Sequence, residues 1–226
     1  MNPTFEHPFF LKTKREQKTI QFKIALFSLL VLLVIGIIVY YLNLGFLIWI
    51  LISLSLTIIA PFFDVPAQIK SGQLIYYSSL FIVEKEKKGM IYIHGGTLFD
   101  YFFFFDKNTK NAGQSKFVLK KYLEGILNLI SEYEVKDKNK TKSLKIQGTS
   151  YIINERTASK LGFTKVKTNN IQKLLLIVNY LNLLCSISLV KGKISFPNLK
   201  NVHTFEISMD KLIENKEYIN RLYQNF

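Results

Sequence analysis

The sequence is poor in the residues that build disulfides and metal centres. It contains one cysteine, Cys185, and three histidines, His7, His94 and His203, which lie far apart along the chain. One cysteine excludes a disulfide within the chain and a metal site made of cysteines. We therefore expect no metal and no cofactor, and we interpret Cys185 as a small core residue rather than a nucleophile.

Arginine and acidic residues are also scarce. Of the 30 basic residues only three are arginine, and 16 acidic residues leave a formal net charge of +14. Specific reading of nucleic acid bases relies heavily on arginine, so this composition argues against a specific nucleic acid partner. Anionic lipid headgroups attract the same positive charge, and we expect membrane lipids as the partner.

Charge is absent from two long apolar stretches, residues 24–42 and 46–63, and the mean hydropathy of the chain is +0.17. The first stretch spans about 28 Å as a helix, close to the thickness of a bilayer core. Residues 43–45 leave room only for a tight turn between the two stretches. We therefore predict a transmembrane helical hairpin over residues 24–64.

The residues that flank the hairpin indicate its orientation. Lysine and arginine are retained on the cytoplasmic side of a membrane, and here they precede and follow the hairpin but are absent from its turn. We expect a multi-pass protein of the cell inner (cytoplasmic) membrane with both termini in the cytoplasm. Residues 1–23, which are basic and aromatic, should lie along the membrane interface, although their aromatic side chains could equally dock onto the cytoplasmic domain.

Small residues share one face of the second stretch. Ser53, Thr57 and Ala60 occur at positions i, i+4 and i+7, a spacing typical of close helix packing in membranes. The pattern predicts either a seam within the hairpin, which we favour, or a contact between copies of the chain.

A third apolar stretch, residues 171–190, has about the length of a membrane span. It contains Gln172, Lys173, Asn179 and Asn182, each of which is costly in lipid. A third crossing would also place the later lysines outside, against the charge rule. We therefore predict a buried core helix.

Residues 65–226 are long enough to form one cytoplasmic domain with its own core. Strand patterns over residues 73–84, 90–94 and 97–105 precede a helical pattern that begins at Ser115. The strand at 97–105 is so aromatic that both of its faces must be covered. The predicted fold class is α+β (mixed) for the cytoplasmic domain, preceded by the two-helix transmembrane hairpin.

The first candidate site follows the strand at 90–94. The segment His94-Gly95-Gly96-Thr97 resembles the oxyanion turn of esterases in the α/β-hydrolase family, but the chain has no Gly-x-Ser-x-Gly elbow. The two glycines allow unusual backbone angles and amides aimed at an anion. His94 and Asp100 could serve there as an acid/base pair. The alternative is a tight bend in which His94 is satisfied by the backbone.

The second candidate site is the strand-to-helix segment at residues 148–157. Asn154 is placed to cap a short helix over residues 154–161, and a helix N-terminus attracts anions. Arg156 offers a planar fork suited to a carboxylate or phosphate. The alternative is a structural ion pair, for example with Glu155.

Three functions remain open. The first is a non-catalytic subunit or scaffold of a membrane-associated assembly, with protein partners or a homo-oligomer, and the lack of a complete catalytic constellation favours it. The second is a ligand-sensing two-helix membrane effector that binds a small anionic molecule. The third is a membrane-anchored enzyme that acts on a lipid or membrane-bound substrate through His94, Asp100 and Arg156.

Overall fold

The fold combines helices with one mixed sheet of six strands. The computed structural model describes residues 7–105, 113–136, 143–150, 153 and 155–226. The strands are ordered β1-β2-β3-β4-β6-β5 across the sheet. Their bounds are β1 (Leu74–Ser78), β2 (Phe81–Glu84), β3 (Met90–Gly95), β4 (Lys145–Ser150), β5 (Thr164–Val166) and β6 (His203–Ser208). The pair β3 and β4 is parallel, and the other neighbouring pairs are antiparallel.

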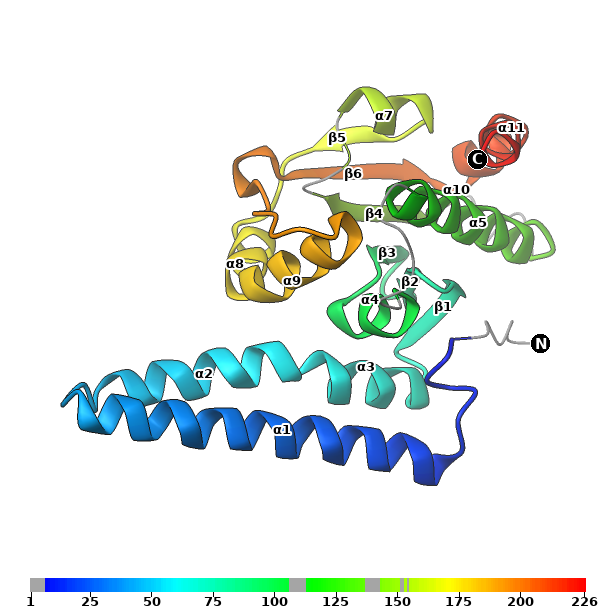
Figure 1. The fold of residues 1–226 in the computed structure, drawn as a ribbon. Helices are drawn as coiled ribbons and strands as arrows, with labels where there is room; N and C mark the ends of the chain where they lie inside the picture. Colours follow the sequence, from blue (N-terminus) through cyan, green and yellow to red (C-terminus); the bar gives the residue numbers. More distant parts are fainter. Residues whose placement is uncertain (1–6, 106–112, 137–142, 151–152, 154) are drawn as a thin grey trace.

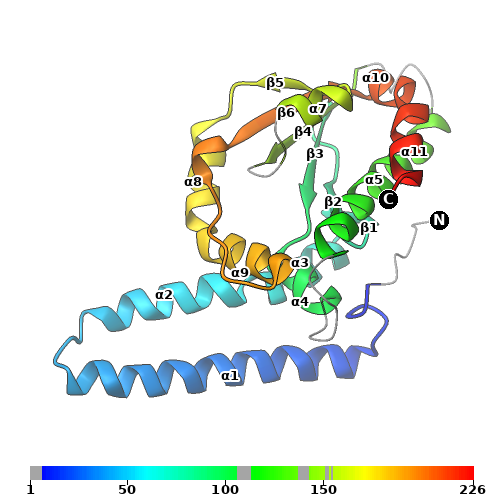
Figure 2. The ribbon, with the colours of Figure 1, turned by 45° about the horizontal axis from the view of Figure 1, so that its top comes forward.

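The N-terminal part is a long apolar helix, α1 (Lys14–Tyr41). A capping box starts it, since Thr13 Oγ1 accepts the N–H of Glu16 while Glu16 Oε2 accepts the N–H of Thr13. Two further helices follow, α2 (Leu47–Ile59) and α3 (Pro61–Lys70). Figures 1 and 2 both show α2 lying beside α1, with α3 leading back to the sheet.

The main core lies between one face of the sheet and the C-terminal helices. Ile91, Ile146 and Ile207 project from three adjacent strands and are almost fully buried. The helix predicted from Ser115 is present, and the short helix predicted near residues 154–161 is present as a six-residue helix. The helices around this core are α5 (Gln114–Glu134), α7 (Glu155–Lys160), α10 (Met209–Glu214) and α11 (Lys216–Gln224). A short 3₁₀ turn, η2 (Leu199–Asn201), precedes β6.

The aromatic segment 97–105 is a helix, α4 (Leu98–Phe104), so the predicted third strand is wrong. A capping box formed by Thr97 and Asp100 starts this helix. Helical spacing puts Phe99 and Phe103 on one face, where they pack against Phe9 in a second buried cluster. The aromatic residues therefore bury one helix face rather than both faces of a strand.

The apolar stretch 171–190 is not one buried core helix, so this prediction is also wrong. It forms two helices, α8 (Asn170–Val178) and α9 (Tyr180–Lys191), which meet at Asn179 with a bend of 67°. No residue of α8 is buried, and the buried residues of α9 are the polar Asn182 and Ser186. Ile171, Leu174, Leu175 and Val178 of α8 are exposed, whereas the apolar side chains of α9 are half-buried and Cys185 and Leu189 pack against the second cluster.

Among the described residues, α1 is the one helix long and apolar enough to cross a membrane by itself. The pairs α2 with α3, bent by 40°, and α8 with α9 meet the same criterion only when each pair is counted as one span. The chain therefore has one candidate span by length and composition, or up to three with both bent pairs.

Candidate functional site

The parallel pair of strands brings the two sequence-predicted segments together. The pairing of β3 with β4 runs from Met90 opposite Lys145 to Ile93 opposite Gly148. Because parallel strands end at the same edge of a sheet, the segment from His94 to Thr97 lies next to Thr149 and Ser150. Ligands of open α/β sheets bind at such carboxyl ends.

A cavity of about 400 Å³ opens at this edge. It is bounded by the ends of β3 and β4, by α5 and α7, and by α8 and α9 on the remaining side. Most of its walls are apolar, and its apolar side chains include Ile93, Leu119, Leu123, Ile126, Leu176, Leu183 and Phe205. Pro61, at the junction of α2 and α3, also lines it, so the cavity reaches the N-terminal helices.

Tyr122 of α5 occupies the space beside the two glycines. Its hydroxyl hydrogen-bonds the N–H of Gly96 and lies 3.1 Å from the hydroxyl of Tyr101. Burial raises the pKa of Tyr122 above its ordinary value, so the phenol stays protonated. A Cβ on Gly95 would lie 2.0 Å from the Tyr122 oxygen. A Cβ on Gly96 would lie 2.9 Å from Leu80 Cδ2. Neither glycine has a positive φ, so Gly95 provides space for Tyr122 and Gly96 for Leu80, and neither provides the unusual backbone angles predicted from the sequence.

Asn182 supplies a buried polar atom to the cavity wall. The side chain is 6% exposed, and its Nδ2 donates to the carbonyl oxygen of Thr57 in α2 at 2.9 Å. Its Oδ1 is buried and accepts no hydrogen bond from any residue that the structure describes. Leaving a buried acceptor unpaired costs about 1–3 kcal/mol, which a donor on a bound molecule would recover.

His94 and Asp100 do not form a pair. His94 is 49% exposed at its side chain and lies 2.8 Å, through Nε2, from Glu84 Oε1. This contact is the main reason why the pKa of Glu84 is lowered. Asp100 is fully buried, and its two oxygens accept hydrogen bonds from Tyr76 and Thr97. The acid/base hypothesis for these two residues therefore lacks the contact that it needs.

Asp100 is the centre of a buried network that includes the N-terminal segment. It accepts hydrogen bonds from the hydroxyl of Tyr76 and from the N–H and hydroxyl of Thr97, the latter two at 2.6 and 2.8 Å. His7 Nε2 lies 3.2 Å from Asp100 Oδ1. His7 Nδ1 accepts the N–H of Phe9 at 3.2 Å, whereas His7 Nε2 makes no hydrogen bond with a described residue.

His7 is the polar residue that sequence reasoning missed. It is fully buried, and its ring stacks on Phe99 at 4.9 Å. The following Phe9 is 1% exposed. Of the two alternatives for the aromatic N-terminal segment, docking onto the domain therefore holds for these two residues. The sequence carries no local signal for this contact, because His7 and Asp100 are separated by the whole of α1, α2 and α3.

The second predicted cluster contributes only in part. Asn154 lies outside the described residues. Arg156 is exposed, does not line the cavity, and forms no ion pair with a described residue, while Glu155 pairs with Lys165 at 3.1 Å. Thr157 of the same helix lines the cavity.

No residue of the stripe Ser53, Thr57 and Ala60 lines the groove found between α1 and α2. The groove between α1 and α2 is lined on the α2 side by Ile48, Leu51 and Ile52. Ser53 is exposed, and the carbonyl of Thr57 contacts α9 through Asn182. At Thr57 the stripe therefore contacts α9, and its role in packing within the hairpin or between copies stays a prediction.

The cavity is suited to apolar rather than anionic molecules. No lysine or arginine occurs among the described residues that line it, and its polar groups are hydroxyls, amides and His94 at the rim. The part of the chain that the structure describes also contains no group of three or more potential metal ligands. No protein-family model, curated protein or solved structure matches this chain.

Proposed function

We propose that the protein is a membrane-anchored binding protein whose cytoplasmic domain holds an apolar, uncharged molecule or acyl chain in the cavity beside β3 and β4. The observation that carries this proposal is the cavity itself, with apolar walls and the buried, unpaired Oδ1 of Asn182. Concave, mainly apolar sites with a few convergent polar groups are typical of small-molecule binding. The ligand is thus apolar rather than the small anion considered from the sequence.

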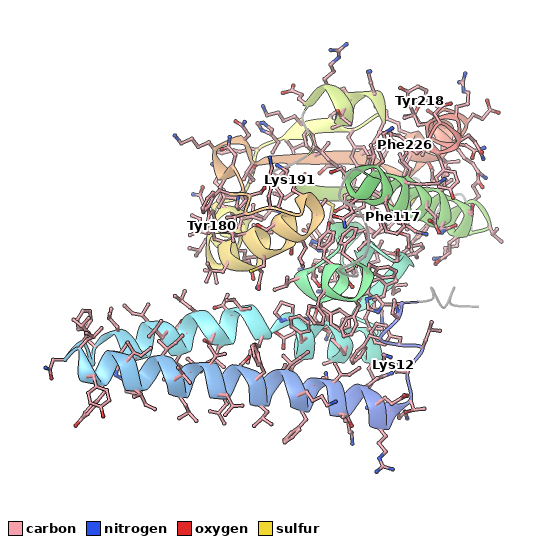
Figure 3. All side chains as sticks on the ribbon, in the orientation of Figure 1. Lys12, Phe117, Tyr180, Lys191, Tyr218 and Phe226 are labelled. Atoms are coloured by element: carbon pink, nitrogen blue, oxygen red, sulfur yellow. The ribbon has the colours of Figure 1, made fainter. Side chains whose placement is uncertain are left out.

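The proposal includes a membrane topology. Residues 24–42 and 46–63 cross the cell inner membrane as an antiparallel hairpin, with both termini in the cytoplasm. Three observations support it: both stretches are uncharged, α2 lies beside α1, and the connecting turn has no lysine or arginine. Many large apolar side chains of α1 and α2 are exposed, among them Leu33, Val34 and Trp49 (Figure 3), as lipid-facing helices require.

Contacts between the cavity and α2 support a ligand-responsive effector. Asn182 lines the cavity and also holds the Thr57 carbonyl, and Pro61 lines the cavity at the end of α2. A molecule that hydrogen-bonds Asn182 or contacts Pro61 therefore acts directly on residues next to the membrane helix. A ligand shifts a conformational equilibrium only through such differential contacts.

The test is a titration of the full-length protein in nanodiscs with cis-parinaric acid, a fluorescent fatty acid. Ser186 lines the cavity at 5% exposure, so Ser186→Leu should fill part of it and weaken binding by about tenfold or more, or about 1.4 kcal/mol. The matched control is Ser131→Leu, at an exposed position of α5. A second filling variant, Leu183→Phe, covers the case in which Ser186→Leu fails to fold.

Two results would count against the ligand proposal: no saturable binding by the wild-type protein, or equal binding by folded Ser186→Leu, Leu183→Phe and Ser131→Leu variants. Extraction of the purified protein, followed by mass spectrometry of the extract, identifies any molecule retained from the cell.

A scaffold subunit is the second candidate function. Ile194 and Phe196 are 77% and 70% exposed on the segment between α9 and η2, and large exposed apolar side chains are typical of contacts with other proteins. Purification from native membranes in mild detergent tests it: a chain that co-purifies at fixed stoichiometry, and is lost in Phe196→Ser, would establish this function.

A further inference from the structure

Helix α8 presents its apolar face to the outside of the domain. Ile171, Leu174, Leu175 and Val178 are 54–64% exposed. Their spacing of i, i+3, i+4 and i+7 places them on one face of the helix. In a soluble domain this face would be buried.

The opposite face of α8 belongs to the protein interior. Gln172 Oε1 accepts a hydrogen bond from the fully buried Thr204 hydroxyl at 3.1 Å, and Leu176, one turn later, lines the cavity. These contacts fix how α8 is rotated about its own axis. The outward direction of its apolar face is therefore a property of the folded domain and not of a loosely attached helix.

The position of α8 relates this face to the membrane helices. The hydrogen bond from Asn182 to Thr57 ties the first turn of α9 to α2, at a residue inside the proposed span 46–63. Figures 1 and 2 both show α8 on the side of the domain that is nearer the turn between α1 and α2. Helix α9 packs against α2 and α8 adjoins α9, so the exposed apolar surface of α8 is connected to α2 through α9.

We infer that α8 is immersed in the cytoplasmic leaflet of the bilayer, as an interfacial helix that lies against lipid without crossing the membrane. The inference rests on the membrane anchor and not on the ligand of the cavity. Amphipathic helices bind the interface through an apolar face flanked by basic residues. Lys173 on α8, and Lys191 and Lys193 at the end of α9, supply positive charge for anionic headgroups.

Lipid is the occupant that the surroundings favour over a partner protein. The apolar face of α8 is connected to the anchor through α9, so a bilayer that covers α2 reaches α8 without any further component. The bend at Asn179 turns the chain back into the domain, and the donor groups of Asn179, Asn182 and Ser186 each donate to a carbonyl oxygen within the protein.

The experiment measures the depth of single fluorescent labels in nanodiscs that contain anionic lipid. With Cys185→Ser as background, an NBD label is attached at Leu175→Cys, at Val34→Cys in α1 as the membrane reference, and at Ser159→Cys on the exposed face of α7 as the aqueous reference. Each label is exposed in turn to lipids with a nitroxide on the acyl chain and to aqueous iodide.

The expected result is that the labels at positions 175 and 34 lose most of their emission to the nitroxide lipids, while the label at 159 responds only to iodide. Quenching of the label at 175 by iodide, or by neither agent because a protein covers it, would overturn the inference provided that position 34 is quenched by lipid. If position 34 also fails, the anchor itself is wrong. Binding of cis-parinaric acid is measured separately, so the two proposals fail independently.

A double variant, Leu174→Ser with Leu175→Ser, removes two apolar side chains from the outer face of α8 and should leave the fold intact. We expect α8 to leave the bilayer in this variant, which is measured as a loss of nitroxide quenching for a label at Val178→Cys.

Discussion

Removing the carboxyl group of Asp100 should destabilise the domain more than any surface substitution. The side chain is fully buried and accepts hydrogen bonds from two residues, Tyr76 and Thr97, and its Oδ1 lies 3.2 Å from His7 Nε2. Burial, together with the nearby carboxyl group, raises the pKa of Tyr76, so its hydroxyl keeps the proton that it donates. In Asp100→Ala three donors lose their acceptor at once, namely the Tyr76 hydroxyl and the N–H and hydroxyl of Thr97.

The size of the effect follows from the donors that are left behind. A buried donor without an acceptor costs about 1–3 kcal/mol, so three such donors should lower the free energy of unfolding by at least about 3 kcal/mol. For a domain of this size, 1 kcal/mol shifts Tm by about 2–4 °C, so we expect Asp100→Ala to lower Tm by at least about 6 °C. Asp100→Asn keeps one acceptor oxygen and should lie between this variant and the wild type.

Thermal unfolding of the purified protein in one detergent, followed by intrinsic fluorescence, measures this shift. Glu217→Ala, in the exposed first turn of α11, is the control that removes a carboxylate without buried partners. Hydrogen exchange adds a local test, because loss of Asp100 should also speed exchange in the segment around His7. A Tm for Asp100→Ala within about 2 °C of that for Glu217→Ala would refute the reasoning. The free energies of unfolding of the two variants would then differ by less than about 1 kcal/mol, although one lacks a buried carboxylate and the other an exposed one.

Two further predictions concern α5 and the edge of the cavity. A Cβ on Gly125 would lie 2.4 Å from the Cβ of Phe81, so Gly125→Ala should lower the free energy of unfolding by about 1–3 kcal/mol through overpacking, although alanine favours helix by about 1 kcal/mol. Gly36→Ala, where nothing lies within 4 Å, is its control in a denaturant titration. The pKa of Glu84 is lowered from 4.5, mainly by His94, so this pair stabilises the fold above pH about 4.5 and its contribution is lost as pH falls through the folded-state pKa. His94→Ala should raise the Glu84 pKa in an NMR titration and change stability at pH 7 by less than about 1 kcal/mol, because the pair is partly exposed.

The helix at residues 98–104 differs from the predicted strand because its cap and its packing outweigh its composition. The run from Phe99 to Phe105 has strong strand propensity, but Thr97-x-x-Asp100 ahead of it is a capping box that indicates a helix. The aromatic cluster around Phe9 and Phe62 then stabilises the helical form. Tertiary packing overrides propensity in such a segment.

In the stretch 171–190, the apolar pattern does not indicate which face of the helix turns toward the protein. Its amphipathic character is visible in the sequence, because Gln172 and Leu176 share one face while Leu174, Leu175 and Val178 share the other. Which face turns inward depends on Thr204 and on the cavity, both of which come from distant parts of the chain. The residues of this stretch alone therefore predict a core helix, and they do not determine which face of α8 contacts the domain.

The candidate site was predictable in its parts and not in its assembly. The glycine turn after β3 and the strand that enters α7 were both recognised from the sequence. Their proximity depends on the parallel pairing of β3 with β4, across a connection that contains α4 and α5. Such long-range pairing leaves no periodic signal, and the contact between His7 and Asp100 leaves none for the same reason.

The distribution of charge separates the binding site from the membrane-facing surface. A chain with a net charge of +14 would be expected to bring cations to an anion site, yet the described residues that line the cavity include no lysine or arginine. The lysines instead lie outside it, as at Lys173 on α8 and Lys191 at the C-terminal end of α9. Electrostatic attraction to a membrane surface needs positive charge on the outside, whereas an apolar ligand needs a cavity free of it. The two requirements are met together if the membrane supplies both the surface that the lysines contact and the apolar molecules that the cavity holds.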